Sequence, residues 1–156
     1  MSEFTHLDGS GHARMVDVTQ KEPTVRRATA EAFVACAAPV VAALRDGSVP
    51  KGDVLAVARV AGIAAAKRTP ELLPLAHVIG VHGVAVDVTV EEEGVRIVAA
   101  VSTADRTGVE MEALTAASIA ALNVVDMVKG LDKATSIRDV RLLSKQGGKS
   151  GGWTRP

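Results

Sequence analysis

Residues 107–129 constrain the fold more than any other part of the chain, because they read as a helix that is apolar on nearly every side. Thr107 and Glu110 fit a capping box, in which a hydroxyl accepts from a first-turn N–H and the carboxylate three residues later reaches back. The residues that follow leave no continuous polar stripe before Asp126. Such a helix is normally buried, and a chain of 156 residues rarely buries one by itself. The pattern therefore predicts a core helix that also packs against another copy of the chain.

Asp126 and Lys129 interrupt the apolar pattern near the end of this helix. Charges in such surroundings cost free energy unless they are paired or used. Residues three apart share a helix face, so the two side chains can reach each other. An ordinary surface ion pair is one interpretation. The apolar neighbours favour partial burial instead, which would shift the proton affinities and suit the pair to general acid–base chemistry.

Glu112 introduces a geometric constraint, because it lies fourteen residues before Asp126 on the same predicted helix. That separation corresponds to about 21 Å along the helix axis. The two carboxylates therefore cannot flank one reacting atom within a single chain. Antiparallel packing of two helices across a two-fold axis would bring Glu112 of one copy near Asp126 of the other. We therefore expect a site that is built between subunits.

Composition excludes several classes of function. The 18 basic and 18 acidic residues balance, so the chain has no broad electrostatic footprint for nucleic acid or for an anionic membrane. Cys36 is the only cysteine, which excludes an internal disulfide framework and a cysteine-based zinc cluster. The sequence contains no signal peptide and no uninterrupted apolar span of about 18 residues, so we expect a cytoplasmic protein.

Hydrophobic periodicity and capping residues predict the order of strands and helices. Strands are expected at residues 28–36, 84–90, 95–101 and 137–144, and helices at 39–46, 54–67, 69–73 and 107–129. We expect one domain over residues 1–156, with an extended or mobile arm at 1–22, where 15–18 can pair along a sheet edge, and a flexible glycine-rich tail at 147–156. This order indicates an α+β fold of ferredoxin-like type, an antiparallel sheet with helices packed on one face.

Three other groups of residues carry weaker chemical signals. The tail contains Gly-Lys-Ser, but Leu143 stands where a Walker loop needs glycine and no helix follows, so Lys149 could touch a phosphate only as a plain charge. His77 and His82 lie five residues apart without a third ligand at a suitable spacing, so no metal site is expected. Lys51 precedes a helix N-terminus, where the helix field favours anions. His77 and Lys51 can equally be loop residues without a function.

Several of these segments together closely resemble the cyclic pyranopterin monophosphate synthase family, the molybdenum-cofactor biosynthesis protein C. The run Thr-Gly-Val-Glu-Met-Glu-Ala-Leu from residue 107 is the most specific. The resemblance covers nearly the whole chain, through residues 15–18, 51–54, 58–63, 65–69, 75–77, 107–115, 126–129, Lys145 and 147–151.

The resemblance implies an enzyme of the lyase class in molybdenum cofactor biosynthesis. Its substrate would be 3',8-cyclo-7,8-dihydro-GTP, made by a partner radical-SAM enzyme, and its products cyclic pyranopterin monophosphate and pyrophosphate. No cofactor is implied, and whether Mg²⁺ accompanies the triphosphate is left open. The family fold is the ferredoxin-like sandwich, in a hexamer built as three dimers with sites at subunit interfaces.

The resemblance also implies roles for individual residues. Asp126 would be the catalytic carboxylate and Lys129 its acid–base partner. Lys51 would be a third catalytic residue. Together with Lys145 and Arg26, it matches basic positions that hold the triphosphate or assist proton transfers. The residues expected to contact substrate are Leu75, Ala76, His77, Met111 and Glu112.

One stretch departs from the family pattern. Where the family usually has Leu-Cys-His-Pro, this chain has Leu75, Ala76, His77 and Val78. Loss of the proline removes a restraint on the turn that aims His77. The alternative to a synthase is therefore a catalytically weak or inactive paralogue that acts as a nucleotide- or pterin-binding oligomer.

Overall fold

The computed structural model describes residues 5–156 and confirms the predicted α+β fold. The elements in chain order are β1 (Thr24–Ala35), α1 (Ala38–Asp46), α2 (Val54–Lys67), α3 (Thr69–Leu72), β2 (Gly83–Glu91), β3 (Gly94–Asp105), α4 (Glu110–Val128), β4 (Ser136–Gln146) and β5 (Trp153–Thr154). Every predicted strand and helix is present. β5 is an additional strand that the sequence did not predict.

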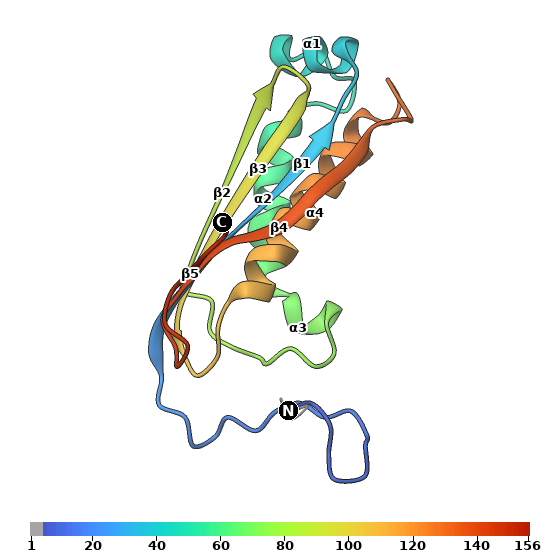
Figure 1. Ribbon diagram of the computed structural model, residues 1–156. Helices are drawn as coiled ribbons and strands as arrows, with labels where there is room; N and C mark the ends of the chain where they lie inside the picture. Colours follow the sequence, from blue (N-terminus) through green and yellow to red (C-terminus); the bar gives the residue numbers. More distant parts are fainter. Residues whose placement is uncertain (1–4) are drawn as a thin grey trace.

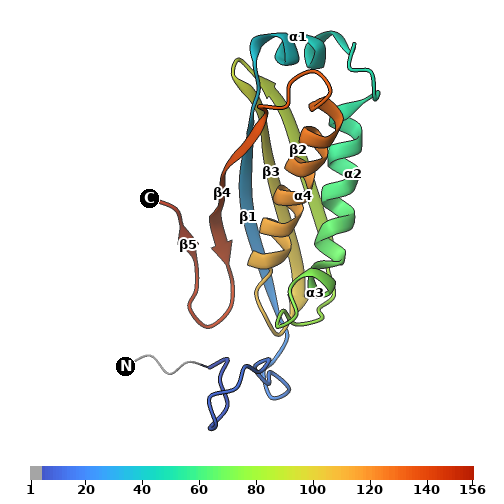
Figure 2. The same cartoon turned by 90° about the vertical axis from the view of Figure 1, so that its right-hand side faces the viewer.

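The sheet is antiparallel, with the strand order β2-β3-β1-β4-β5. α2 and α4 lie side by side on one face, and α1 lies at the far end of the sheet (Figures 1 and 2). Apart from β5, the order of strands and crossover helices is that of the ferredoxin-like fold. Among the residues that the structure describes, no helix covers the other face of the sheet, in agreement with the prediction of helices on one face.

Small residues make up most of the core between the sheet and the two long helices. Alternate residues of β1 from Ala28 to Val34 point toward the helices and are buried. Gly62 of α2 packs tightly against α4, because a Cβ there would lie 3.0 Å from the Ala116 carbonyl oxygen. It would also lie 3.1 Å from a methyl group of Val86 on β2. The two helices and the sheet therefore meet where only glycine fits easily.

α4 differs from its predicted form in two respects. It begins at Glu110, with Val109 as N-cap and no side-chain capping bond, so the predicted capping box at Thr107 is wrong. It also leaves an apolar face uncovered in the single chain, since Met111 and Leu122 are exposed. The helix is long and apolar enough to cross a membrane by length and composition, yet half of it is buried against the rest of the fold. It is the core helix of the domain.

The two ends of the described chain lie outside the helix–sheet core. The arm before β1 contains one isolated bridge, between Leu7 and Ala13, and runs below the sheet (Figure 1). Within residues 5–156, the segment 15–18 does not pair with a sheet edge, contrary to that prediction. At the other end, β5 turns back along β4, with Trp153 opposite Lys145.

Candidate active site

The sequence-predicted site residues form two clusters, one at each end of α4. The cluster at the C-terminal end joins Asp126, Lys129 and Lys51. Lys129 Nζ lies 2.6 Å from Asp126 Oδ1, and Lys51 Nζ lies 3.3 Å from Asp126 Oδ2. Lys51 Nζ also donates to the main-chain carbonyl of Asp126 at 3.0 Å. The predicted contact between Asp126 and Lys129 is therefore confirmed, and the fold adds Lys51 to it.

The start of α2 explains how Lys51 reaches this cluster. Asp53 caps α2 by accepting from the Ala56 N–H at 3.0 Å, as predicted. Gly52 has φ +103°, a conformation that L side chains rarely adopt. The sharp turn just before the helix directs the Lys51 side chain to the end of α4.

The two ammonium groups set the charge of the Asp126 carboxylate. Hydrogen bonds from Lys129 and Lys51, in that order, hold the pKa of Asp126 below its usual value. The side chain of Asp126 is 54% exposed and that of Lys129 is 57% exposed. The partial burial that the sequence predicted is thus not found in the single chain. Asp126 is an ionised acceptor in open contact with two cationic donors.

The cluster at the N-terminal end of α4 surrounds a pocket. All five residues expected to contact substrate line it: Leu75, Ala76, His77, Met111 and Glu112. Glu112 is only 3% exposed. Burial raises the pKa of its carboxyl, the charge of nearby Glu110 raises it further, and His77 opposes this effect. At this end of the helix, a half-polar pocket therefore holds a carboxyl whose pKa is raised beside an imidazole.

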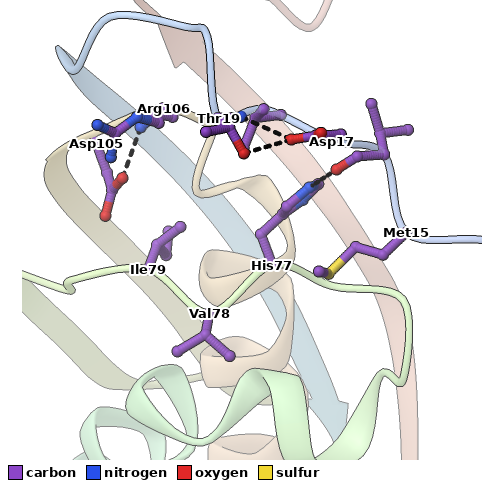
Figure 3. Close-up of a pocket in the computed structure, with 10 residues that line it drawn as sticks. Met15, Asp17, Thr19, His77, Val78, Ile79, Asp105 and Arg106 are labelled. Atoms are coloured by element: carbon purple, nitrogen blue, oxygen red, sulfur yellow. Dashed lines mark hydrogen bonds between the residues drawn. The ribbon is translucent and has the colours of Figure 1, made fainter.

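The arm before β1 covers His77, as Figure 3 shows. His77 Nε2 lies 2.5 Å from the Val16 carbonyl oxygen, and a carbonyl can only accept, so Nε2 carries the proton. The Arg106 Nε–H donates to the Lys21 carbonyl at 2.9 Å and attaches the arm a second time. Val78 is 86% exposed next to His77. The sequence did not predict this contact of the arm with His77.

Lys145 and Arg26 lie at the same end as the His77 pocket and away from Lys51. Lys145 Nζ is 3.4 Å from Glu110 Oε1, and Glu110 also lines the pocket. Arg26 is buried and donates from Nε to the Asp105 carbonyl at 3.2 Å. The predicted basic residues are therefore divided between the two ends of α4. A single chain brings Lys145 and Arg26 near His77, and Lys51 near Asp126.

Among residues 5–156, no three His, Cys, Asp or Glu side chains are placed to bind a metal ion together. His82, which the sequence offered as a partner for His77, instead accepts from the Ala104 N–H at 3.0 Å through Nδ1.

The fold and the two clusters define a ferredoxin-like α+β protein with a carboxylate–ammonium centre and a separate pocket lined by His77 and Glu112. Residues 15–148 match the MoaC family, and the chain belongs to this family, as predicted. It is 59% identical to the cyclic pyranopterin monophosphate synthase of Streptomyces coelicolor, over 97% of this chain and 89% of that protein. It is 58% identical to the synthase of Nocardioides sp., over 98% and 96%. A protein of Mycobacterium tuberculosis named cyclic pyranopterin monophosphate synthase 2 is 52% identical, over 98% and 92%.

Proposed function

We propose that this protein is a cyclic pyranopterin monophosphate synthase, a lyase of molybdenum cofactor biosynthesis. It converts 3',8-cyclo-7,8-dihydro-GTP to cyclic pyranopterin monophosphate and releases pyrophosphate. The observation that carries the proposal is the Asp126 carboxylate held between the ammonium groups of Lys129 and Lys51, in a chain of this family. Such a centre supplies both a proton acceptor and proton donors within one contact.

The two clusters have different roles in the proposed reaction, one in proton transfer and the other in stabilising negative charge. Opening and closing the pterin ring requires protons to move at carbon, nitrogen and oxygen, which Asp126 and Lys129 relay. Asp126 is ionised at neutral pH, a state that Lys129 and Lys51 stabilise, and its carboxylate is therefore available as a proton acceptor. Formation of a cyclic phosphate places negative charge on the departing pyrophosphate. Lys145 and Arg26 stabilise that charge from the other cluster.

The pocket at the N-terminal end of α4 positions the substrate. His77 and Glu112 supply hydrogen-bonding groups, and Leu75, Ala76 and Met111 supply shape and apolar contact. The arm fixes the proton of His77 on Nε2, so Nδ1 is the ring nitrogen left for the substrate.

The complete site requires a second copy of the chain. The clusters lie at opposite ends of α4, and its uncovered apolar face, with Met111 and Leu122, suits contact with an antiparallel α4. In that arrangement, Glu112 of one protomer approaches Asp126 of the other. The assembly is a hexamer of three dimers in the cytoplasm, and a radical-SAM enzyme supplies the substrate.

The replacement Asp126→Asn tests the proposed chemistry. It keeps the size of the side chain and removes the proton acceptor, so turnover of the cyclised nucleotide should fall about 10²–10⁴-fold. Pyrophosphate release and formation of the pterin product give the measurement, and size-exclusion chromatography shows that the assembly persists. Asp87→Asn, an exposed position on β2, is the matched control and should keep full activity. Unchanged turnover in Asp126→Asn would remove Asp126 from the proposed chemistry, whereas a wild type that forms no product would favour the inactive paralogue.

Lys129→Ala should reduce product formation in the same assay, because it removes the closest donor to Asp126. An unchanged rate with purified variant would remove Lys129 from the proposed proton relay.

A further inference from the structure

The loop of residues 78–82, called the His77 loop below, runs from His77 to β2 and is held by side chains at the end of β3. The Gly80 N–H donates to Asp105 Oδ2 at 3.0 Å. The hydroxyl of buried Thr103 donates to the Gly80 carbonyl. Both main-chain polar groups of Gly80 are therefore bonded to side chains of one strand, which lies in the middle of the sheet.

His82 attaches the other end of the His77 loop to the same strand. Its N–H donates to the Ser102 carbonyl at 3.0 Å, and its Nδ1 accepts from the Ala104 N–H at 3.0 Å. The imidazole lies against Gly80, because a Cβ at that glycine would lie 3.1 Å from His82 Nε2. The His77 loop thus takes its position from β3.

The second oxygen of the Asp105 carboxylate points to the attachment of the arm. Asp105 Oδ1 accepts from the Arg106 N–H at 2.7 Å. The Arg106 side chain in turn donates to the Lys21 carbonyl of the arm at 2.9 Å. The arm carries the Val16 carbonyl that accepts from His77 Nε2. One carboxylate is therefore connected to His77 from two sides, through the loop and through the arm.

Asp105 has no direct bond to His77. Both residues line a cavity of about 570 Å³ beneath the arm, and they lie on different sides of it (Figure 3). Among the hydrogen bonds of residues 5–156, none joins these two side chains. The Gly80 and Arg106 N–H groups, in that order, hold the pKa of Asp105 below its usual value. An ionised acceptor strengthens both attachments, since hydrogen bonds to charged groups are the stronger ones.

We propose that Asp105 is a positioning residue, which aligns the His77 imidazole for the substrate by holding the His77 loop and the arm together. The proposal rests on the proposed function, in which His77 contacts the substrate. A binding group must be held close to its productive geometry by the residues around it. Loss of the carboxylate releases both attachments, whereas Asp126 and Lys129 at the other end of α4 keep their contact. Substrate binding should therefore suffer more than proton transfer.

Steady-state kinetics with the cyclised nucleotide test this division. Asp105→Ala should raise KM about tenfold, the effect of one lost hydrogen bond to a charged group, and should change kcat by less than about twofold. Asp105→Asn keeps an oxygen that can accept from the Gly80 N–H, so its KM should stay within about threefold of wild type. Asp87→Ala, which removes an exposed carboxylate of β2, is the matched control and should have wild-type constants. Circular dichroism and size-exclusion chromatography verify that each variant is folded and assembled.

Deuterium exchange at the Cε1–H of each histidine, measured by mass spectrometry, reports on His77 without any substrate. In Asp105→Ala, His77 should exchange about threefold faster, because its loop and its cover open more often. His12 has a side chain that is 79% exposed and serves as the internal reference, with an unchanged rate. Arg106→Ala alters an exposed side chain and releases the arm alone, so it should give a smaller increase at His77. Wild-type KM together with wild-type exchange at His77 in Asp105→Ala would overturn the proposal.

The two measurements separate this inference from the proposed function. If the wild type forms the pterin product, and Asp105→Ala changes neither KM nor the exchange of His77, the positioning role is refuted and the synthase assignment stands. If the wild type forms no product but His77 exchanges faster in Asp105→Ala, Asp105 still positions His77 and the synthase assignment fails.

Discussion

Two inactive variants should restore each other's activity when they share a dimer. His77→Ala damages the cluster at the N-terminal end of α4, and Asp126→Asn damages the cluster at its C-terminal end. These residues belong to groups about 21 Å apart along one helix, as judged from the spacing of Glu112 and Asp126. If one site takes its two halves from different protomers, a mixed dimer contains one site with both halves intact.

The expected recovery follows from the two-fold symmetry. Random mixing of equal amounts gives about one half mixed dimers, and each mixed dimer has one intact and one doubly damaged site. The mixture should therefore reach about one quarter of wild-type activity per protomer. A hexamer of three dimers gives the same fraction, because each site lies within one dimer.

The assay compares co-expressed and separately purified variants. Each variant alone, and the two mixed only after assembly, should show the residual activity of the parents. Wild-type protein treated in the same way defines full activity per protomer. Co-expressed assemblies whose activity equals the parental average would refute the shared site, because a site contained in one chain gains nothing from a mixed dimer.

The remaining predictions concern stability. Gly62→Val should reduce the free energy of unfolding by about 1–3 kcal/mol, because its added carbons meet Ala116 and the sheet at once. Gly130→Val, in open space, should change it by less than about 0.5 kcal/mol, and equal losses in urea titrations followed by circular dichroism would contradict the packing argument. Glu112→Gln should gain stability relative to wild type as pH rises above about 4.3, because burial raises the pKa of the folded carboxyl and ionising it then costs stability. A difference that is constant between acidic and neutral pH would contradict this reasoning.

Most of the fold could be predicted because its signals are local. The alternation from Ala28 to Val34 and the cap at Asp53 depend on neighbouring residues, and both appear as expected. The start of α4 could not be predicted in the same way. Glu110 pairs with Lys145 from a distant strand instead of capping its own helix, so a tertiary contact overrides the capping motif. β5 exists only through pairing with β4, and its two residues carry no strand pattern of their own.

The site shows the same division between local and distant contacts. The contact between Asp126 and Lys129 could be predicted from their spacing on one helix. Lys51 joins them only through the packing of α2 against α4, which the sequence does not show. The contact of His77 with Val16 uses a main-chain carbonyl, which leaves no pattern in the side chains. Asp126 is more exposed than predicted because it lies one helical turn after Leu122, on the face of α4 that the sheet does not cover.

The fluorescence of Trp153 makes it possible to follow the last strand separately from the rest of the fold. The chain has one tryptophan and no tyrosine, and that indole stands 41% exposed on β5. Intrinsic fluorescence of the native protein therefore reports the attachment of this short strand, while far-ultraviolet dichroism reports the helices. Where the two unfolding curves separate, the earlier fluorescence change marks release of the C-terminal segment from an otherwise intact domain.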